Sequence, residues 1–165
     1  VINTGHVEFR ALHTPGHSPG HYVFYFEKDG ILFSSDLDLA ARGPWYGGAS
    51  CDFGLLEESV RKIMNIKPEI LVTSHRKVFY RKHDDIDGMF IKYLDIALSR
   101  EERVIKYFNE SRTLADLALL EFSSQGQPAN QFEEFWSKVM IQKHVDNLLR
   151  KKIITEVETG RWARI

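Results

Sequence analysis

The sequence predicts an α/β (α+β) fold for residues 1–82, followed by a mostly helical domain over residues 83–165. Up to Val78, short runs of β-branched and aromatic residues alternate with glycine and proline, which is typical of strands and turns. From His83 onward, apolar residues recur at helical spacing. One helical pattern interrupts the strands of the first region, and this mixture favours an α/β arrangement over an all-β one.

Four runs in the first region are predicted to be strands, because they are rich in β-branched and aromatic residues and bounded by turn residues. They cover residues 7–12, 21–27, 31–35 and 69–74. Lys28-Asp29-Gly30 predicts a hairpin turn between the second and third strands. Residues 55–66 have apolar side chains at helical spacing, and Lys67-Pro68 ends that helix.

The second region predicts three helices and a β-hairpin. The helices cover residues 86–110, 112–122 and 132–152, with a loop at 123–128. Thr113 is the expected N-cap of the second helix, with Asp116 at capping-box spacing. The last residues form two short strands about a Thr159-Gly160 turn. This order is that of a winged helix-turn-helix, so we expect a winged-helix-like domain over residues 83–165.

The composition is that of a folded protein. Hydrophobic residues make up 43% of the chain and charged residues 27%, and the formal net charge is −1. This charge excludes a global attraction to nucleic acid or to anionic membranes. Cys51 is the single cysteine, and no apolar run approaches the roughly 20 residues that span a bilayer. We expect a cytoplasmic protein without a membrane partner, whose sequence begins partway through a domain.

Two histidines and one aspartate each follow a predicted strand. His17 lies in Thr-Pro-Gly-His, Asp36 follows Phe-Ser-Ser, and His75 follows Thr-Ser. Loops beyond strand ends expose side chains on a backbone that the sheet holds rigid. Imidazole and carboxylate groups suit zinc, iron or manganese. The sequence therefore predicts that His17, Asp36 and His75 are metal ligands.

Neighbouring side chains compete for these roles. His13 and His21 flank His17, at the end of one strand and the start of the next, and we expect them to orient ligands or to be structural. Asp38 competes with Asp36, but the position directly after the Ser-Ser turn favours Asp36. Thr14 and Ser74 are further candidates for orienting the ligands.

Other polar and aromatic residues receive weaker assignments. Trp45 and Tyr46, which follow Pro44, are candidates for the wall of a substrate pocket, although Trp45 could equally cover the sheet. Cys51 is expected to be inert, because no base lies at motif spacing from it. The remaining histidines are expected to lie on the surface or on helices without a role; these are His6, His83 and His144.

The order T-P-G-H-S-P-G-H, then F-S-S-D, then a helix, then T-S-H resembles the second half of the metallo-β-lactamase superfamily. The helical tail resembles the winged-helix extension of its glyoxalase II-like and lactamase-β-2-like members. The resemblance implies half of an αββα sandwich over residues 1–82. It also implies two divalent metal ions, with His17 on the first, His75 on the second and Asp36 bridging both as the catalytic carboxylate. A hydroxide between the ions would attack a thioester, an ester or a similar small-molecule substrate.

One motif of the family is missing from this sequence. H-x-H-x-D-H supplies four of the usual seven ligands and lies upstream of T-P-G-H in the family, but it does not occur here. Each ion would keep two ligands from this chain, whereas zinc normally needs three or four. We therefore expect a C-terminal fragment of a larger hydrolase that is inactive alone. Its exposed apolar surface should make it self-associate or retain the missing N-terminal half.

Two other functions stay open on the sequence. Some winged-helix members of the family cleave phosphodiester bonds in RNA, and the chain could also be a non-catalytic binding or dimerisation module. Basic side chains in the tail could contact phosphate: Lys138, Lys143, Arg150, Lys151, Lys152, Arg161 and Arg164. Acidic side chains interleave with them and favour a solvated face over nucleic-acid binding: Glu133, Glu134, Asp146, Glu156 and Glu158.

Overall fold

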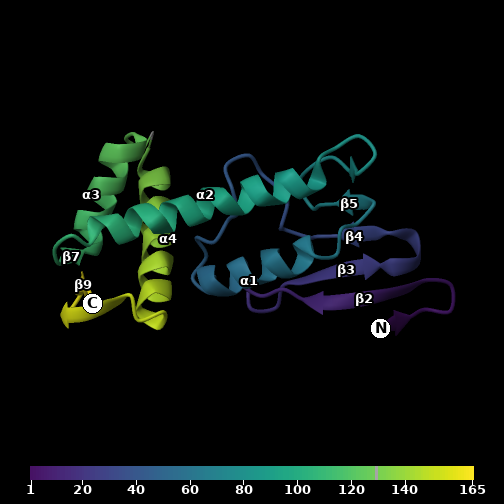
Figure 1. Cartoon of the computed structure of the whole chain (residues 1–165), viewed down its shortest axis with the longest axis horizontal. Coiled ribbons are helices and arrows are strands. Elements are labelled where there is room, and N and C mark those ends of the chain that lie inside the picture. The colour runs from purple at the N-terminus through teal and green to yellow at the C-terminus, as the bar shows by residue number, and fades with distance from the viewer. Residues whose placement is uncertain (129) are drawn as a thin grey trace. The chain divides into compact units, whose positions relative to one another are not determined.

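The computed structural model describes residues 1–128 and 130–165 (Figure 1). Contacts within the chain divide it into two compact units, each made of two segments. The first unit comprises Val1–Trp45 and Ser50–Ala97, and the second comprises Tyr46–Ala49 and Leu98–Ile165.

The division between the units falls inside helix α2 (Ile86–Tyr107), after Ala97, whereas the sequence places a domain boundary between residues 82 and 83. The N-terminal half of α2 belongs to the first unit. There, a Cβ added at Gly43 would lie 2.8 Å from Cγ2 of Ile96. Gly43 has a φ of +83°, a conformation that suits glycine.

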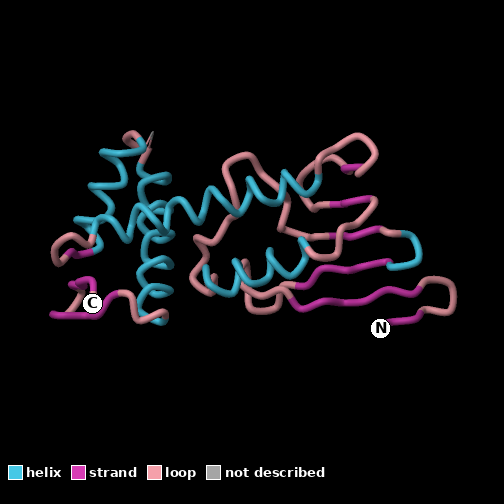
Figure 2. Tube along the Cα trace, viewed as in Figure 1, coloured by secondary structure: helices cyan, strands magenta, loops and turns pink. Residues whose placement is uncertain are grey.

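The first unit contains a six-stranded sheet in the order β1-β2-β3-β4-β5-β6 (Figure 2). Strands β4 and β5 pair in parallel, and all other neighbours are antiparallel. Helix α1 (Phe53–Met64) lies between β4 and β5 in the chain and makes the crossover that a parallel pair requires. The strands are β1 (Ile2–Asn3), β2 (Glu8–His13), β3 (Tyr22–Phe26), β4 (Ile31–Phe33), β5 (Ile70–Val72) and β6 (Phe79–Tyr80).

The two faces of this sheet differ in burial. Val23, Leu32 and Leu71 alternate onto one face and are fully buried. The opposite face carries four half-buried phenylalanines, which we call the aromatic face: Phe9, Phe24, Phe26 and Phe33. The ring of Phe24 lies 5.7 Å from that of Phe9 and 6.2 Å from that of Phe33, so the side chains form a continuous row across three strands.

The second unit combines the C-terminal part of α2 with two helices and a three-stranded sheet in the order β7-β9-β8. Its further elements are β7 (Arg112–Thr113), α3 (Leu114–Gln125), α4 (Gln131–Arg150), β8 (Ile154–Glu158) and β9 (Arg161–Arg164). Ten buried residues form its core: Val104, Phe108, Leu117, Ala118, Phe122, Ile141, Val145, Leu148, Ile154 and Trp162. The capping box between Thr113 and Asp116 is confirmed. The winged-helix interpretation of this unit stays a prediction.

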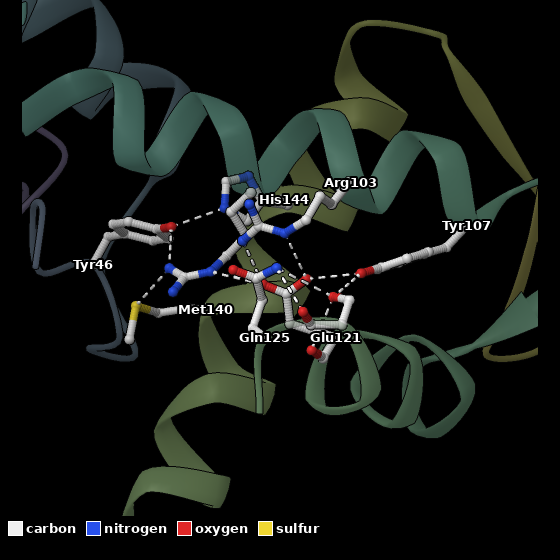
Figure 3. A network of polar contacts seen from close by, with 9 residues as sticks. Tyr46, Arg103, Tyr107, Glu121, Gln125, Met140 and His144 are labelled. Atoms are coloured by element: carbon white, nitrogen blue, oxygen red, sulfur yellow. Dashed lines mark hydrogen bonds and ion pairs between the residues drawn. The ribbon is translucent and has the colours of Figure 1, made fainter. Parts of the chain in front are cut away.

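A buried polar network lies beside this core (Figure 3). Glu121 is 5% exposed and accepts hydrogen bonds from Arg103, at 2.7 and 3.1 Å, and from the hydroxyl of Tyr107, at 3.1 Å. Nε of Arg100 lies 3.6 Å from Oε1 of Glu121. The two arginines lower the pKa of Glu121 against the opposing effect of burial, so this carboxylate stays charged inside the unit.

The mixed α/β class is confirmed, and most predicted elements appear with shifted ends. The predicted turn at residues 28–30 is a 3-10 helix, Glu27–Asp29, closed by Gly30 at a φ of +64°. Helix α3 continues to Gln125, into the predicted loop. The two-residue strands β1, β6 and β7 were not predicted, because so short a run shows no alternation. Within the described part of the chain, no helix is long and apolar enough to cross a membrane.

Candidate metal centre

The first unit brings the three predicted ligands together from loops that follow three different strands. His17 lies between β2 and β3, Asp36 follows β4, and His75 follows β5. Nε2 of His17 lies 3.7 Å from Oδ2 of Asp36, and Nε2 of His75 lies 2.9 Å from Oδ1 of the same carboxylate. The two histidines therefore approach the two oxygens of one aspartate, which is the geometry of a carboxylate placed between two imidazole groups.

The Thr-Pro-Gly-His turn depends on a glycine at residue 16. Gly16 has a φ of +128°, and a Cβ added there would lie 2.2 Å from the backbone nitrogen of Leu56 near the start of α1. No side chain larger than hydrogen fits without moving the helix backbone. The amide of Asp52, the N-cap of α1, donates a hydrogen bond to the Gly16 carbonyl at 2.8 Å. The turn is thus held tightly against the start of α1.

Hydrogen bonds fix the orientation of His17. Its Nδ1 lies 3.1 Å from the carbonyl oxygen of Trp45. A carbonyl only accepts, so the proton sits on Nδ1, and the lone pair on Nε2 is directed toward Asp36 in the neutral ring. The thiol of Cys51 donates to the His17 carbonyl at 2.8 Å. Cys51 therefore has a structural contact that the sequence did not reveal, because its partner lies 34 residues away.

His21 is buried beneath the centre and contacts Asp36 through its ring. Nδ1 lies 3.0 Å from the carbonyl oxygen of Thr14, and Nε2 lies 3.3 Å from the amide nitrogen of Asp36. Burial lowers the pKa of His21, and the nearby His17 lowers it further. A neutral ring agrees with these hydrogen bonds. His13 is exposed, and its Nε2 lies 2.7 Å from the Pro19 carbonyl.

The structure separates the two candidate carboxylates. Asp38 forms an ion pair with Arg76, with Nε of the arginine 3.5 Å from Oδ2, and accepts a hydrogen bond from the Ala40 amide. Its carboxylate is thus already engaged by residues of its own loop and by Arg76. Asp36, by contrast, faces both histidines. The fold thus brings the carboxylate of Asp36, and not that of Asp38, to both histidines.

A cavity of about 190 Å³ opens at the centre. Its wall comprises His17, Asp36, Asp38, Ala40, Arg42, Gly43, Trp45 and His75. Trp45 is 39% exposed and lines the cavity, and its role in a substrate pocket stays a prediction. A second cavity, of about 510 Å³, lies over the start of β3 and includes His21 and Asp36 in its wall.

The pocket assignment of Tyr46 is wrong. Its side chain is fully buried in the second unit, where the hydroxyl binds His144 at 2.8 Å and Arg100 at 2.7 Å. His144 lies on helix α4, which is one of the two places expected for it, but its ring is fully buried, so the surface alternative is wrong. His6 and His83 are exposed. Periodicity alone could not predict the contact between Tyr46 and His144, because the two residues are 98 positions apart.

The side chains at the centre are of the types that bind a divalent metal, but they are fewer than the ligands that such ions normally have. Two imidazoles and a carboxylate are ligands that zinc, iron and manganese accept. His17 with Asp36, and Asp36 with His75, would give two ligands for each of two ions. Over residues 1–128 and 130–165, no group of three or more His, Cys, Asp or Glu side chains is arranged to hold a metal ion. Further ligands would have to come from outside this set.

Comparisons with known proteins found a matching family model and several relatives. Residues 1–75 match the family model described as Metallo-beta-lactamase superfamily. A hydroxyacylglutathione hydrolase of Chelativorans sp. is 34% identical over 73 residues, which cover 44% of this chain and 28% of that protein. A hydroxyacylglutathione hydrolase of Francisella tularensis subsp. novicida is 27% identical over 155 residues, which cover 92% of this chain and 54% of that protein.

A solved structure shows the same fold. A metallo-beta-lactamase family protein of Thermus thermophilus superposes with a TM-score of 0.74 at 19% identity, over 99% of this chain and 52% of that one. The chain thus spans about half the length, or less, of these relatives. The matched segment, residues 1–75, ends at His75 and contains all three candidate ligands. Over residues 1–75, the chain therefore resembles the metallo-β-lactamase superfamily.

Proposed function

We propose that this chain is the C-terminal part of a metal-dependent hydrolase that acts on a thioester, an ester or a similar small molecule. The observation that carries the proposal is the meeting of His17 and His75 at the two oxygens of Asp36. The relatives named hydroxyacylglutathione hydrolase support an acyl compound as substrate. This chain covers 54% of the Francisella relative and 52% of the Thermus structure, which supports a larger parent protein.

Each residue at the centre would have a separate role in binding metal or substrate. His17, Asp36 and His75 would hold the two divalent ions, with Asp36 shared between them. When bound, such ions supply an activated water for attack on a carbonyl or phosphorus. Trp45 offers an apolar surface beside the centre for the substrate. The Trp45 carbonyl keeps the His17 proton on Nδ1, so that Nε2 stays available.

The aromatic face supports the proposal that a further layer packs on this sheet in the parent protein. Phe9, Phe24 and Phe33 are half-buried although they sit in the middle of the sheet, on the face opposite the fully buried Leu32 and Leu71. In a sandwich, such a row is covered by a second sheet about 10 Å away. We propose the missing N-terminal half as its partner in the intact protein.

Asp36 and Asp38 offer a matched pair for the test. In the full-length protein, Asp36→Asn should abolish hydrolysis of a generic acyl thioester and lower the metal content measured by elemental analysis. Asp38→Asn, two residues away on the same loop, should retain bound metal and measurable turnover. Full activity of the Asp36→Asn variant would contradict the proposal. Cleavage of single-stranded RNA, with no turnover of the thioester, would replace this substrate class by a phosphodiester.

A further inference from the structure

We propose that His21 is a positioning residue that fixes the Asp36 backbone and, through it, the carboxylate that His17 and His75 approach. The inference rests on the proposed function of Asp36 as a bridging ligand. It gives a defined part to a histidine that is buried at the centre, 5% exposed, and is not itself one of the three candidate ligands.

Both ring nitrogens of His21 are engaged by the protein. The Asp36 amide can only donate, so Nε2 of His21, 3.3 Å away, accepts and carries no proton. The proton therefore sits on Nδ1, 3.0 Å from the Thr14 carbonyl and 2.9 Å from the Thr14 hydroxyl. With Nε2 accepting from Asp36 and Nδ1 carrying the proton, the ring has no free lone pair for a metal. The ring instead links Thr14, just after β2, to the turn after β4.

The turn that holds Asp36 has an unusual backbone. Ser35 has a φ of +51°, a left-handed conformation that residues with a side chain seldom adopt. Such a conformation persists only where the surroundings over-determine it. The Ser35 hydroxyl donates to the Tyr22 carbonyl at 2.8 Å, and the Ser74 amide donates to the Ser35 carbonyl at 2.9 Å. These contacts hold Ser35, and the His21 ring holds the next amide, that of Asp36.

The position of the Asp36 carboxylate follows from this support. Without the acceptor at Nε2, the Asp36 amide loses its partner and the turn can relax. The separations of 3.7 Å to His17 and 2.9 Å to His75 would then no longer be fixed. Supporting hydrogen bonds of this kind typically change metal affinity by roughly 10- to 100-fold when removed.

Two substitutions at residue 21 separate positioning from simple filling of space. The amide of glutamine in His21→Gln can reach the place of Nε2 and accept from Asp36. The shorter side chain in His21→Asn reaches only the place of Nδ1 and keeps the Thr14 contact. His13→Asn is the matched control, because His13 lies in the same stretch, is exposed and contacts the Pro19 carbonyl rather than Asp36.

The experiment uses this chain labelled with ¹⁵N, and Co²⁺ as the probe. In the metal-free protein, we expect a coupling across the hydrogen bond between the Asp36 amide nitrogen and Nε2 of His21. His21→Asn should weaken Co²⁺ binding, followed by its absorption spectrum, by roughly 10- to 100-fold. His21→Gln should recover most of this loss, and His13→Asn should bind as the unsubstituted chain does.

Different results would contradict the inference and the proposed function. Absence of the coupling, Co²⁺ binding by His21→Asn equal to that of the unsubstituted chain, or an equal loss in His21→Asn and His21→Gln would each overturn the positioning role. Failure of Co²⁺ to perturb His17, Asp36 and His75 in the unsubstituted chain would instead contradict the metal site. In that case, the ¹⁵N shift of the His75 ring decides the inference: it should change in His21→Asn and not in His21→Gln.

Discussion

Nε2 of His144 lies 2.8 Å from the hydroxyl oxygen of Tyr46, and both side chains are fully buried although 98 residues separate them. An arginine N–H can only donate, and Arg100 donates to the same hydroxyl at 2.7 Å. The hydroxyl can donate its hydrogen to Nε2, and the His144 proton then sits on Nδ1, 3.3 Å from Oε2 of Glu101. This arrangement suits a neutral His144, and burial lowers the pKa of this ring.

The neutral His144 makes the chain sensitive to acid. Burial lowers its pKa, against the raising effect of Glu101, while Arg100 lowers it and Glu121 raises it. The unfolded state therefore takes up a proton below about pH 6.5 that the folded state does not, and stability falls as the pH falls, by up to about 1.4 kcal/mol per pH unit. Denaturant unfolding at pH 7.5, 6.5 and 5.5 should show this loss.

The slope of the free energy of unfolding against pH should be smaller in His144→Gln. It should be unchanged in His83→Gln, a substitution at an exposed histidine. An unchanged slope in His144→Gln would be evidence against the assignment.

Glu101 should add a second loss of stability in stronger acid. Hydrogen bonds from His144, Lys151 and Asn147 outweigh burial and lower its pKa from 4.5 to about 2. A carboxylate with a depressed pKa stabilises the folded state above pH 4.5, and this stabilisation is lost as the pH falls from 4.5 toward 2. For the unsubstituted chain, the free energy of unfolding measured with denaturant should therefore keep falling from pH 5 to pH 2.5. A Glu101→Gln variant should unfold more easily at pH 7 and show a smaller change over this range.

Gly16 should tolerate no side chain, in contrast to a glycine four residues later. Gly16→Ala introduces a Cβ 2.2 Å from the Leu56 nitrogen at a φ of +128°. We expect it to lower the free energy of unfolding by about 2 kcal/mol or more. Gly20→Ala is the control, since its added Cβ meets nothing within 4 Å. If chemical denaturation finds the two variants equally stable, the close approach of the turn to α1 is wrong.

The aromatic face should drive association of the chain in solution. A row of half-buried phenylalanines exposes apolar area that water disfavours, so we expect light scattering to report species larger than a monomer. Phe24→Glu, in the middle of the row, should shift the population toward the monomer. Leu119→Glu, at a 66% exposed position on α3, should leave it unchanged. A monomer at all concentrations of the unsubstituted chain would count against this surface as an interface.

Elements with a long local pattern were predictable because their cause is local. Helix α2 shows apolar residues at helical spacing over many turns, and β3 shows a dense run of aromatic and β-branched residues. The capping box at Thr113 needs only two side chains three residues apart. Two-residue strands such as β6 exist only because a neighbouring strand offers hydrogen-bond partners, so their own residues show no sign of them.

The sequence alone was enough to single out His17, Asp36 and His75, because each follows a strand in a turn whose residues are recognisable. Tertiary structure decided which atoms meet: Asp36 faces both histidines, whereas Asp38 turns to Arg76. It also placed Tyr46 against His144, in contrast to its neighbour Trp45 at the cavity wall. The physical reason is that turns and periodicities arise from neighbours in the chain. Burial and hydrogen-bond partnership depend on residues that only folding brings together.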